Sequence, residues 1–519
     1  MSSNILQTIV DKRKQDIASL GYEFGFDIPK ERTRKIHPFV QSKGVILEVK
    51  RASPSKGDIA PGLDSAATAL AYSRAGARAI SCLTETHYFK GTLQDLMNVC
   101  AAVDAFEKET GLTGPAVLRK DFLLDENEVE VAFRAGADAV LLIARILDKE
   151  TLLKMAQKAA GLGISVLLEV RSDDDLQKLE YVMARVEHQY ILCGVNSRDL
   201  RDFTIDLLTP ARMLKKIKQI APDARITFES GILSPSSAGF AASMGFSAIL
   251  LGEAAARNPD IAKEYVTAFE TTPVNMRGDS WVRFANRPQL SDGASKRPLV
   301  KICGITNISD ALKAAEYGAD FLGFILFNKS KRNTNASFIT ECKAELEKKF
   351  GDRRPVLVAV VADNDSDEYD QAIQLACSGT VDFIQLHGIK VCKEFIKNPD
   401  FNKLPHYCAV NIKTAADLQD FEYLNSIGEP RILIDAISET AVGGTGIQVD
   451  ADLVKKVSEK HKLWLAGGIT AENVNSIIKN YNPELIDVSS SVETAPGIKN
   501  VEKLKCFFDI LSADCKLKV

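Results

Sequence analysis

Charged side chains stand at the ends of apolar runs in the first half of the chain. Burying an unpaired charge costs several kcal/mol, so each of them needs a partner or a chemical role. One alone would more often be a structural ion pair, but the same pattern at six run ends favours an active site. Lysines and glutamates in one dry cavity shift each other's pKa values apart, as a general acid and a general base require. The polar residues at these positions are Glu48, Lys50, Lys120, Glu169, Asn196, Arg198, Glu229 and Ser230.

Three loops of the same half suggest a phosphate-binding site. Residues 52–57 (ASPSKG) offer hydroxyls and backbone N–H groups, and 229–232 (ESGI) and 250–255 (LLGEAA) bring glycine and small residues to two consecutive loops. Helix N-termini in such loops bind phosphate, although a single glycine in a turn is more often only a helix cap. The candidate contacts are Ser53, Ser55, Gly231, Gly252 and Glu253.

The second half begins with a cysteine in a setting that favours reactivity. Cys303 ends an apolar run and precedes Gly304 and the start of a helix, a position that can lower the pKa of a thiol. A buried cysteine is usually inert packing, so this residue alone is weak evidence. Asp435 ends a later apolar run, and glycine and serine loops follow the last runs. The further candidates in this half are Arg332, His387, Gly444, Gly446, Gly467, Gly468, Ser489 and Ser490.

Short apolar runs rich in Val, Ile and Leu must position these residues. They recur at roughly even spacing, and each is followed by a stretch with helical periodicity. A run that is continuously apolar predicts a parallel strand that crossover helices bury on both faces. The first half has eight such runs, at 45–50, 79–83, 116–120, 139–144, 166–170, 190–196, 225–230 and 248–253. The second half has eight more, at 299–303, 321–326, 356–361, 383–387, 407–412, 431–435, 463–467 and 485–490.

This pattern predicts an α/β fold of two tandem (β/α)8 TIM barrels. A helix that ends in a glycine turn just before a strand recurs in both halves, as in FRAGADAVL and AEYGADFLG. Active sites of such barrels lie at the C-terminal ends of the strands, where the candidate residues stand. We expect one barrel within residues 1–270, a linker without periodicity at 271–297 and a second barrel at 298–519. The 44 residues before the first strand predict one or two helices that cover the barrel bottom or the substrate mouth.

The composition is that of a globular protein with small partners. Of 519 residues 45% are hydrophobic, and 65 basic against 69 acidic residues give a net charge of −4. This balance favours neither nucleic acid nor an anionic membrane. The ten cysteines form no CxxC pair or metal-ligand cluster, and no signal peptide is evident, so we expect a cytoplasmic protein without a metal. We expect phosphorylated small molecules as partners, and a monomer.

The motifs of the first half resemble those of indole-3-glycerol phosphate synthase over residues 1–270. The matching segments are, in order, ILEVKRASPSKG, VLRKDF, LLEV, GVNSRDL, ESGI and LLGEAA. The second half resembles phosphoribosylanthranilate isomerase over residues 298–519, through VKICGIT, GFILFNKSKR, QLHG, ILID, GGTG, LAGGIT and DVSSSVE. The chain departs from the two family patterns at Glu253, 447–450, Ala471 and Ser491.

The resemblance implies a bifunctional enzyme of tryptophan synthesis that needs no cofactor, with the C-terminal barrel acting first. In that barrel Asp435 would protonate the ribose ring oxygen and Cys303, as a thiolate, would remove the C2 proton. Arg332 would bind the anthranilate carboxylate. The glycine and serine loops would hold the phosphate.

In the first barrel the resemblance makes Lys120 the general acid on the ketose carbonyl. Glu48 and Glu169 would handle later proton transfers, and Lys50 would pair with Glu48 or the phosphate. The substrate would be oriented by Asn196, Arg198, Glu229 and Ser230. Two alternatives stay open: a barrel isomerase of the histidine-pathway type, which favours Asp where this chain has Glu48 and Cys303, and a phosphate-binding scaffold without catalysis, which predicts loss of the acid and base residues.

Overall fold

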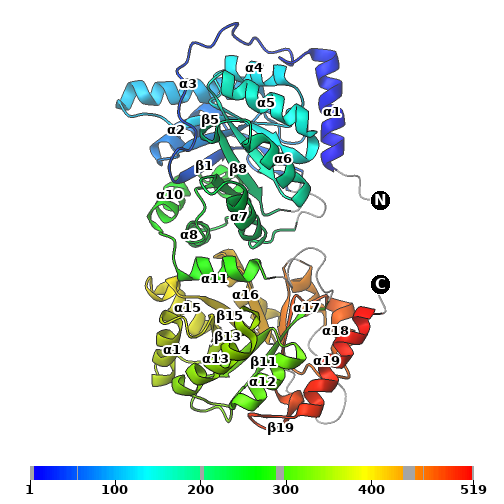
Figure 1. Ribbon diagram of the computed structural model, residues 1–519. Coiled ribbons are helices and arrows are strands. Elements are labelled where there is room, and N and C mark those ends of the chain that lie inside the picture. Colours follow the sequence, from blue (N-terminus) through cyan, green and yellow to red (C-terminus); the bar gives the residue numbers. More distant parts are fainter. Residues whose placement is uncertain are drawn as a thin grey trace. The chain divides into compact units, whose positions relative to one another are not determined.

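The computed structural model describes residues 5–54, 56–198, 204–287, 297–435, 451–459 and 461–516. The chain divides into two compact units, Met1–Val274 and Asn275–Val519. Each unit contains one closed barrel of parallel strands with helices around it (Figure 1). The prediction of two tandem (β/α)8 barrels is therefore confirmed.

The strands of the first barrel pair in chain order from β4 to β10, and β1 lies between β10 and β4 to close the ring. Their side chains are almost all buried, because helices cover the outside and side chains fill the inside. The strands are β1 (Gly44–Val49), β4 (Ala79–Leu83), β5 (Ala116–Lys120), β6 (Ala139–Ile143), β7 (Ser165–Val170), β8 (Ile191–Asn196), β9 (Arg225–Glu229) and β10 (Ala248–Leu251). The helices between and after them are α2 (Ser65–Arg74), α3 (Leu93–Thr110), α4 (Glu126–Arg134), α5 (Lys149–Gly161), α6 (Asp173–Met183), α7 (Thr209–Ile220), α8 (Pro235–Ser243), α9 (Glu253–Arg257) and α10 (Ala262–Thr271). A small hairpin of β2 (Ala52–Ser53) and β3 (Gly57–Asp58) follows β1.

The second barrel repeats this plan, and β11 pairs with both β12 and β18. Its strands are β11 (Leu299–Cys303), β12 (Phe321–Ile325), β13 (Val356–Val361), β14 (Phe383–His387), β15 (His406–Asn411), β16 (Ile432–Asp435), β17 (Trp464–Ala466) and β18 (Leu485–Val488). The helices are α12 (Ile308–Tyr317), α13 (Ala336–Phe350), α14 (Asp367–Cys377), α15 (Ile389–Lys397), α16 (Leu418–Ser426), α17 (Ala451–Ser458), α18 (Val474–Tyr481) and α19 (Val501–Lys516). A hairpin of β19 (Glu493–Ala495) and β20 (Ile498–Lys499) lies between β18 and α19.

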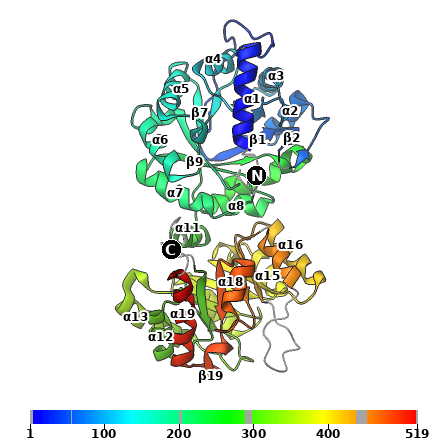
Figure 2. The ribbon, with the colours of Figure 1, turned by 90° about the vertical axis from the view of Figure 1, so that its right-hand side faces the viewer.

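The segment before β1 covers both ends of the first barrel. Helix α1 (Ile5–Leu20) lies across the ring of helices in Figure 2, and its Leu6 and Ile9 line the same cavity as the strand ends. Further along, Phe39 and Val40 join the core inside the barrel. From the sequence, this segment could cover either the bottom of the barrel or the substrate mouth. In the structure it reaches both.

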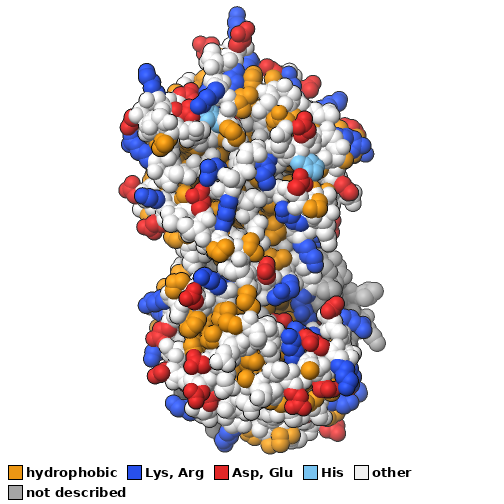
Figure 3. Space-filling model, turned by 60° about the vertical axis from the view of Figure 1, so that its left-hand side comes forward, with side chains coloured by type: hydrophobic (Ala, Val, Ile, Leu, Met, Phe, Trp, Pro, Cys, Tyr) orange, Lys and Arg blue, Asp and Glu red, His pale blue; other side chains and the backbone are white. Residues whose placement is uncertain are grey.

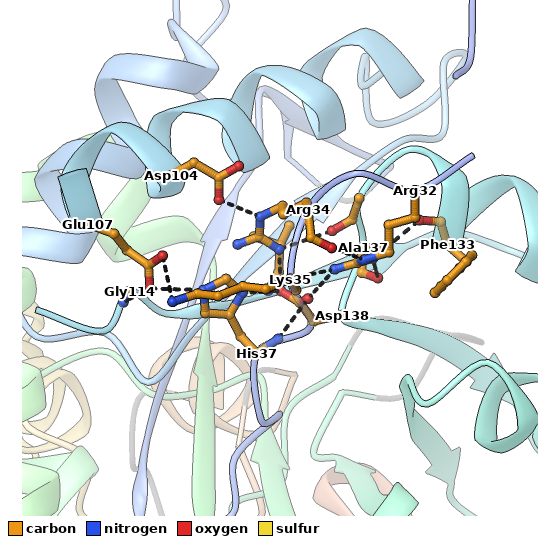
Figure 4. Close-up of polar contacts among 12 residues, drawn as sticks. Arg32, Arg34, Lys35, His37, Asp104, Glu107, Gly114, Phe133, Ala137 and Asp138 are labelled. Carbon is orange, nitrogen blue, oxygen red and sulfur yellow. Dashed lines mark hydrogen bonds and ion pairs between the residues drawn. The ribbon is translucent and has the colours of Figure 1, made fainter. Parts of the chain in front are cut away.

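An ion-pair network holds residues 32–37 of this segment to the bottom of the barrel (Figure 4). The carboxylate of Asp138, just before β6, lies 2.6 Å from Arg32 Nη2 and 2.6 Å from Arg34 Nη1. It also accepts the backbone N–H of His37 at 3.0 Å and that of Val117 at 2.9 Å. Burial alone would raise the pKa of Asp138, but these donors hold it below its usual range. The network therefore stabilises the end of the barrel that is remote from the predicted site.

The structure differs from the linker that the sequence predicts at 271–297. Helix α11 (Met276–Ala285) lies within that range and belongs to the second unit. The ring of its buried Trp281 lies 4.9 Å from that of Phe383 and 6.2 Å from that of Trp464, between ring centroids. Because Phe383 and Trp464 begin β14 and β17, α11 closes the N-terminal end of the second barrel. The helix escaped sequence analysis because it is short and mixes Arg, Asp and Gly with its apolar positions.

Acidic and basic side chains are interspersed on the surface of each unit drawn in Figure 3. Neither sign gathers into a large patch on that face, in keeping with the near-zero charge balance of the sequence. In the part of the chain that the structure describes, no helix is long and apolar enough to cross a membrane.

Candidate active sites

A cavity lies at the C-terminal ends of the strands of the first barrel. Apolar side chains from α1, β6 and the loops after β4 and β5 form part of its wall. A cavity of this kind suits a small-molecule ligand. The sequence-predicted residues that line it are Glu48, Lys50, Ser53, Lys120, Glu169, Asn196, Arg198, Glu229, Ser230, Gly231, Gly252 and Glu253.

Lys120 is the central cation of this cavity. Its Nζ lies 3.4 Å from Glu229 Oε2 and 3.9 Å from Glu48 Oε2. Burial alone would lower the pKa of Lys120, but the charges of Glu229, Glu48 and Glu169 outweigh burial and raise it. The ammonium therefore keeps its proton at neutral pH and can donate hydrogen bonds to a ligand in the cavity.

Burial shifts the pKa values of two glutamates of the cavity, Glu229 and Glu169. Burial raises the pKa of Glu229 to about 7 despite the attraction of Lys120, and the charges of Glu169 and Glu48 add to the rise. Burial also raises the pKa of Glu169, against the opposing charges of Lys120 and Arg171. Carboxyl groups with raised pKa values can exchange protons near neutral pH.

Lys50 and the loops after β9 and β10 complete this cavity. From the sequence, the partner of Lys50 could be either Glu48 or the phosphate. In this structure Lys50 pairs with Glu48, with Nζ 3.1 Å from Glu48 Oε1. Ser230 and Gly231 both adopt left-handed backbone, with φ of 66° and 75°. For a serine this conformation is uncommon, and such positions gather at functional sites. A Cβ on Gly252 would lie 2.6 Å from Glu48 Oε1, so glycine leaves room for that carboxylate.

In the second barrel the predicted acid and base occupy strand ends of the same face. Cys303 ends β11 and is 8% exposed, Asp435 ends β16, and His387 ends β14. Burial raises the pKa of Cys303, and the charges of Lys301 and Lys499 oppose the rise. Burial also raises the pKa of Asp435, against the charge of His387. Among the described residues, the buried Oδ1 of Asp435 has no hydrogen-bond partner.

Arg332 lies over the loop that follows Cys303. A Cβ on Gly304 would stand 2.6 Å from Arg332 Cδ, so the glycine after the cysteine lets the arginine approach. The guanidinium donates three hydrogen bonds to Glu493, from Nε to Oε1 at 2.9 Å and to Oε2 at 3.1 Å, and from Nη2 to Oε2 at 2.6 Å. A substrate carboxylate at Arg332 would therefore meet a guanidinium that Glu493 already orients.

The glycine and serine loops lie after β17 and β18. Gly467 and Gly468 have φ of 95° and 60°, which favour glycine. Ser489 Oγ donates to the carbonyl oxygen of Cys303 at 3.1 Å, and Ser490 begins a short 3-10 turn. Three predicted contacts lie outside the described residues: Ser55, Gly444 and Gly446. Within the described ranges, no group of three or more His, Cys, Asp or Glu side chains could hold a metal ion.

Each of the two units matches a different known protein family. The family model of indole-3-glycerol phosphate synthase matches residues 6–267. The model of N-(5'phosphoribosyl)anthranilate (PRA) isomerase matches residues 300–510. The chain belongs to these two families, one in each unit. The resemblance in the sequence motifs is thereby confirmed, and the two barrels are called the synthase domain and the isomerase domain below.

Relatives with both domains are named for tryptophan biosynthesis. The "Tryptophan biosynthesis protein TRP1" of Phytophthora nicotianae is 30% identical, over 97% of this chain and 96% of the relative. The "Tryptophan biosynthesis protein TrpCF" of Vibrio parahaemolyticus is 31% identical, over 89% of this chain and 83% of the relative. The "Multifunctional tryptophan biosynthesis protein" of Schizosaccharomyces pombe is 32% identical over 90% of this chain, which spans only 59% of that relative.

Several residues of both domains were missed by sequence reasoning. In the synthase domain, Phe89 and Phe122 line the cavity, and Lys50 Nζ lies 5.5 Å from the ring centroid of Phe89. Aromatic residues just after the strand ends could have been noticed. In the isomerase domain, Lys301 and Asp487 lie inside otherwise apolar strands, and a charged residue in such a run was the signal to follow.

Proposed function

We propose that the chain catalyses two consecutive steps of tryptophan synthesis. The isomerase domain converts N-(5-phosphoribosyl)anthranilate to 1-(2-carboxyphenylamino)-1-deoxyribulose 5-phosphate by an Amadori rearrangement. The synthase domain converts that product to indole-3-glycerol phosphate, with release of CO2 and water. The two family matches and the names of relatives that span both domains support this assignment.

In the isomerase step Asp435 protonates the ring oxygen, which opens the ribose to an imine. Cys303, as a thiolate, then removes the proton from C2, which gives an enolamine. This enolamine takes up a proton at C1 and loses the proton of its C2 hydroxyl, which gives the aminoketose. The raised pKa of Asp435, which burial causes, supports its role as an acid. Arg332 binds the anthranilate carboxylate, and the loops after β16, β17 and β18 hold the phosphate.

In the synthase step Lys120 donates a hydrogen bond and then a proton to the ketose carbonyl, which activates it for attack by the aromatic carbon. Loss of CO2 restores the ring electrons, and Glu48 and Glu169 transfer the protons that accompany loss of water. Asn196, Arg198, Glu229 and Ser230 orient the hydroxyls and the carboxylate. Since the substrate's own imine and carbonyl accept electrons in both steps, no cofactor is required.

The Lys120 ammonium, held between Glu229 and Glu48 in the cavity at the strand ends, is the observation that carries the synthase assignment. The test is to supply purified protein with N-(5-phosphoribosyl)anthranilate and follow indole fluorescence. Cys303→Ser should fail with this substrate yet form indole product when given the carboxyphenylamino intermediate. If neither substrate gives an indole product with the parent chain, the proposed function is wrong.

We also propose that the chain is a cytoplasmic monomer that binds phosphorylated small molecules and no nucleic acid. The even mixture of acidic and basic residues supports the last point. Light scattering of the purified chain should give the mass of one copy, and a mass of two copies would contradict the proposal.

A further inference from the structure

A fully buried cation lies beneath Cys303 in the isomerase domain. Lys301 Nζ lies 2.6 Å from Asp487 Oδ2 and 2.7 Å from Gln385 Oε1. The same Gln385 oxygen accepts the hydroxyl of Tyr407 at 2.8 Å. Replacing a buried ion pair by apolar residues is often neutral or stabilising, so stability alone does not account for its presence.

The strand register places the two members of this ion pair side by side on the neighbouring strands β11 and β18. Lys301 is the register partner of Asp487 on β18, Asp487 is that of Ala466 on β17, and Ala466 is that of Asp435 on β16. Cys303 stands two residues after Lys301, so both side chains leave β11 on the same side. Cys303 stands two residues nearer the mouth than Lys301. Because the strands are tilted, register partners climb around the barrel, so Asp435, three strands away, also lies nearer the mouth than Lys301.

Gly323 on the neighbouring strand shows how close the thiol and the lysine chain are. A Cβ at Gly323 would lie 2.8 Å from Cys303 Sγ and 3.0 Å from Lys301 Cε. The sulfur and the end of the lysine chain therefore border the same small space. Asp487 and Gln385 hold the ammonium in place, because it cannot move without losing two short hydrogen bonds.

We propose that Lys301 is a positioning residue of the isomerase reaction, whose ammonium, fixed by Asp487 and Gln385 beneath Cys303, stabilises the thiolate that removes the substrate proton. This inference rests on the role proposed above for Cys303. It adds a second requirement to that role: a thiol at the end of β11 is not sufficient without the buried cation below it.

The charges around Cys303 agree with this role. Burial raises the pKa of the thiol, Lys301 lowers it by its charge and a hydrogen bond, Asp487 raises it, and Lys499 lowers it. Burial alone would lower the pKa of Lys301, but Asp487 and Cys303 outweigh burial and raise it, so the ammonium persists at neutral pH.

Two other cations near Cys303, Lys499 and Arg332, both pair with Glu493. Lys499 Nζ donates to the carbonyl oxygen of Cys303 at 2.6 Å and pairs with Glu493 Oε1 at 2.7 Å, so it mainly holds the backbone. Arg332 also pairs with Glu493. Lys301 is therefore the cation best placed to act on the sulfur itself.

The test measures the titration of Cys303 in three variants, without substrate. Iodoacetamide labelling of the Cys303 peptide is followed by mass spectrometry over a range of pH. Lys301→Met should move the titration upward by about one pH unit or more, which is about tenfold less thiolate at neutral pH. Asp487→Asn should move it downward, because it removes the anion that opposes the thiolate. The exposed Lys348, whose side chain is 78% exposed, supplies the control Lys348→Met, which should leave the titration unchanged.

The double variant Lys301→Met with Asp487→Asn guards against loss of folding, because it leaves no unpaired buried charge. It should titrate above the parent, since Lys301 affects the thiol more than Asp487 does. A purely structural ion pair would destabilise both single variants without moving the titration in opposite directions, and that result overturns the inference.

Activity separates this inference from the proposed function. For each variant, isomerase kcat/KM at neutral pH should follow the thiolate fraction, with KM nearly unchanged. If Cys303→Ser is inactive but Lys301→Met keeps the parent titration and rate, only the role of Lys301 is wrong. If Cys303→Ser keeps the parent rate, the role of Cys303 is wrong, and the catalytic role of Lys301 falls with it.

Discussion

The two barrels place their central lysine at different depths, and depth decides what each lysine can do. Lys120 is the last residue of β5, and its side chain, 15% exposed, lines the cavity. Lys301 stands two residues before the end of β11, and its side chain is 0% exposed. In the same fold, a lysine at the last residue of its strand can therefore touch a substrate. A lysine two residues earlier in its strand is buried and can act only through its neighbours.

The two lysines also differ in the charge that surrounds them. Lys120 faces three glutamates, and their charges raise its pKa. Lys301 faces one aspartate, which raises its pKa most, and Cys303 and Tyr407 raise it further. The synthase domain therefore keeps a protonated ammonium for donation, whereas the isomerase domain uses its ammonium to stabilise a thiolate.

The largest expected effect is that of Lys120→Ala. Removing the general acid should lower ring closure by about 10²–10⁴-fold, because no other described cation stands as close to both Glu229 and Glu48. Isomerase activity should be unchanged, and the carboxyphenylamino intermediate should accumulate in a chromatographic assay. Ring closure above a few per cent of the parent would assign the acid role to another residue.

The second-largest loss of activity is expected for Cys303→Ser, in the isomerase reaction. A serine hydroxyl, with a pKa far above that of a thiol, should lower activity at neutral pH by about 10²-fold or more. The active form carries a proton on Asp435 and none on Cys303, so kcat/KM of the parent should rise past the lower of the two pKa values and fall past the higher. Initial rates over a range of pH give this profile. If kcat/KM did not change as the pH passes one of the two pKa values, the group with that pKa would have no role in the mechanism.

The bottoms of the barrels offer the next test, because different interactions close them. The isomerase domain uses aromatic packing by α11, where the ring centroids of Phe284 and Trp464 lie 5.6 Å apart. Trp281→Ala should lower the unfolding free energy of the separately expressed residues 275–519 by about 3–5 kcal/mol. Met276→Ala, at a 38% exposed position of the same helix, should have little effect. Equal denaturant midpoints for the two variants would show that α11 does not stabilise the barrel.

Sequence analysis predicted the two barrels because the parallel strands are short, mostly apolar runs at even spacing, and strand ends meet at one face. This rule placed Lys120, Glu229 and Glu48 in one cavity without knowledge of any distance. It could not find Lys301 and Asp487, because their pairing depends on the register between β11 and β18.

Helix α11 was missed for a different reason. Its stability depends on rings of Phe383 and Trp464, which are contributed by strands far along the chain, and a local pattern of ten residues does not contain that information. The glycines inside strands were missed because only the neighbouring side chain shows why glycine is needed.

Substitution of these strand glycines should cause the smallest loss of activity. A Cβ on Gly194 would lie 2.2 Å from Glu229 Oε1, so Gly194→Ala should displace that carboxylate from Lys120 and lower ring closure by about tenfold, or about 1.4 kcal/mol. Gly323→Ala should act likewise on Cys303 and lower isomerase activity alone. Gly161→Ala is the control, because no atom lies within 4 Å of its added Cβ. Separate assays of the two steps decide the outcome: each strand variant should impair only its own domain. A loss of both activities from one glycine variant would mean that the two sites depend on each other, and the contrast between Lys120 and Lys301 could no longer be explained by depth within separate barrels.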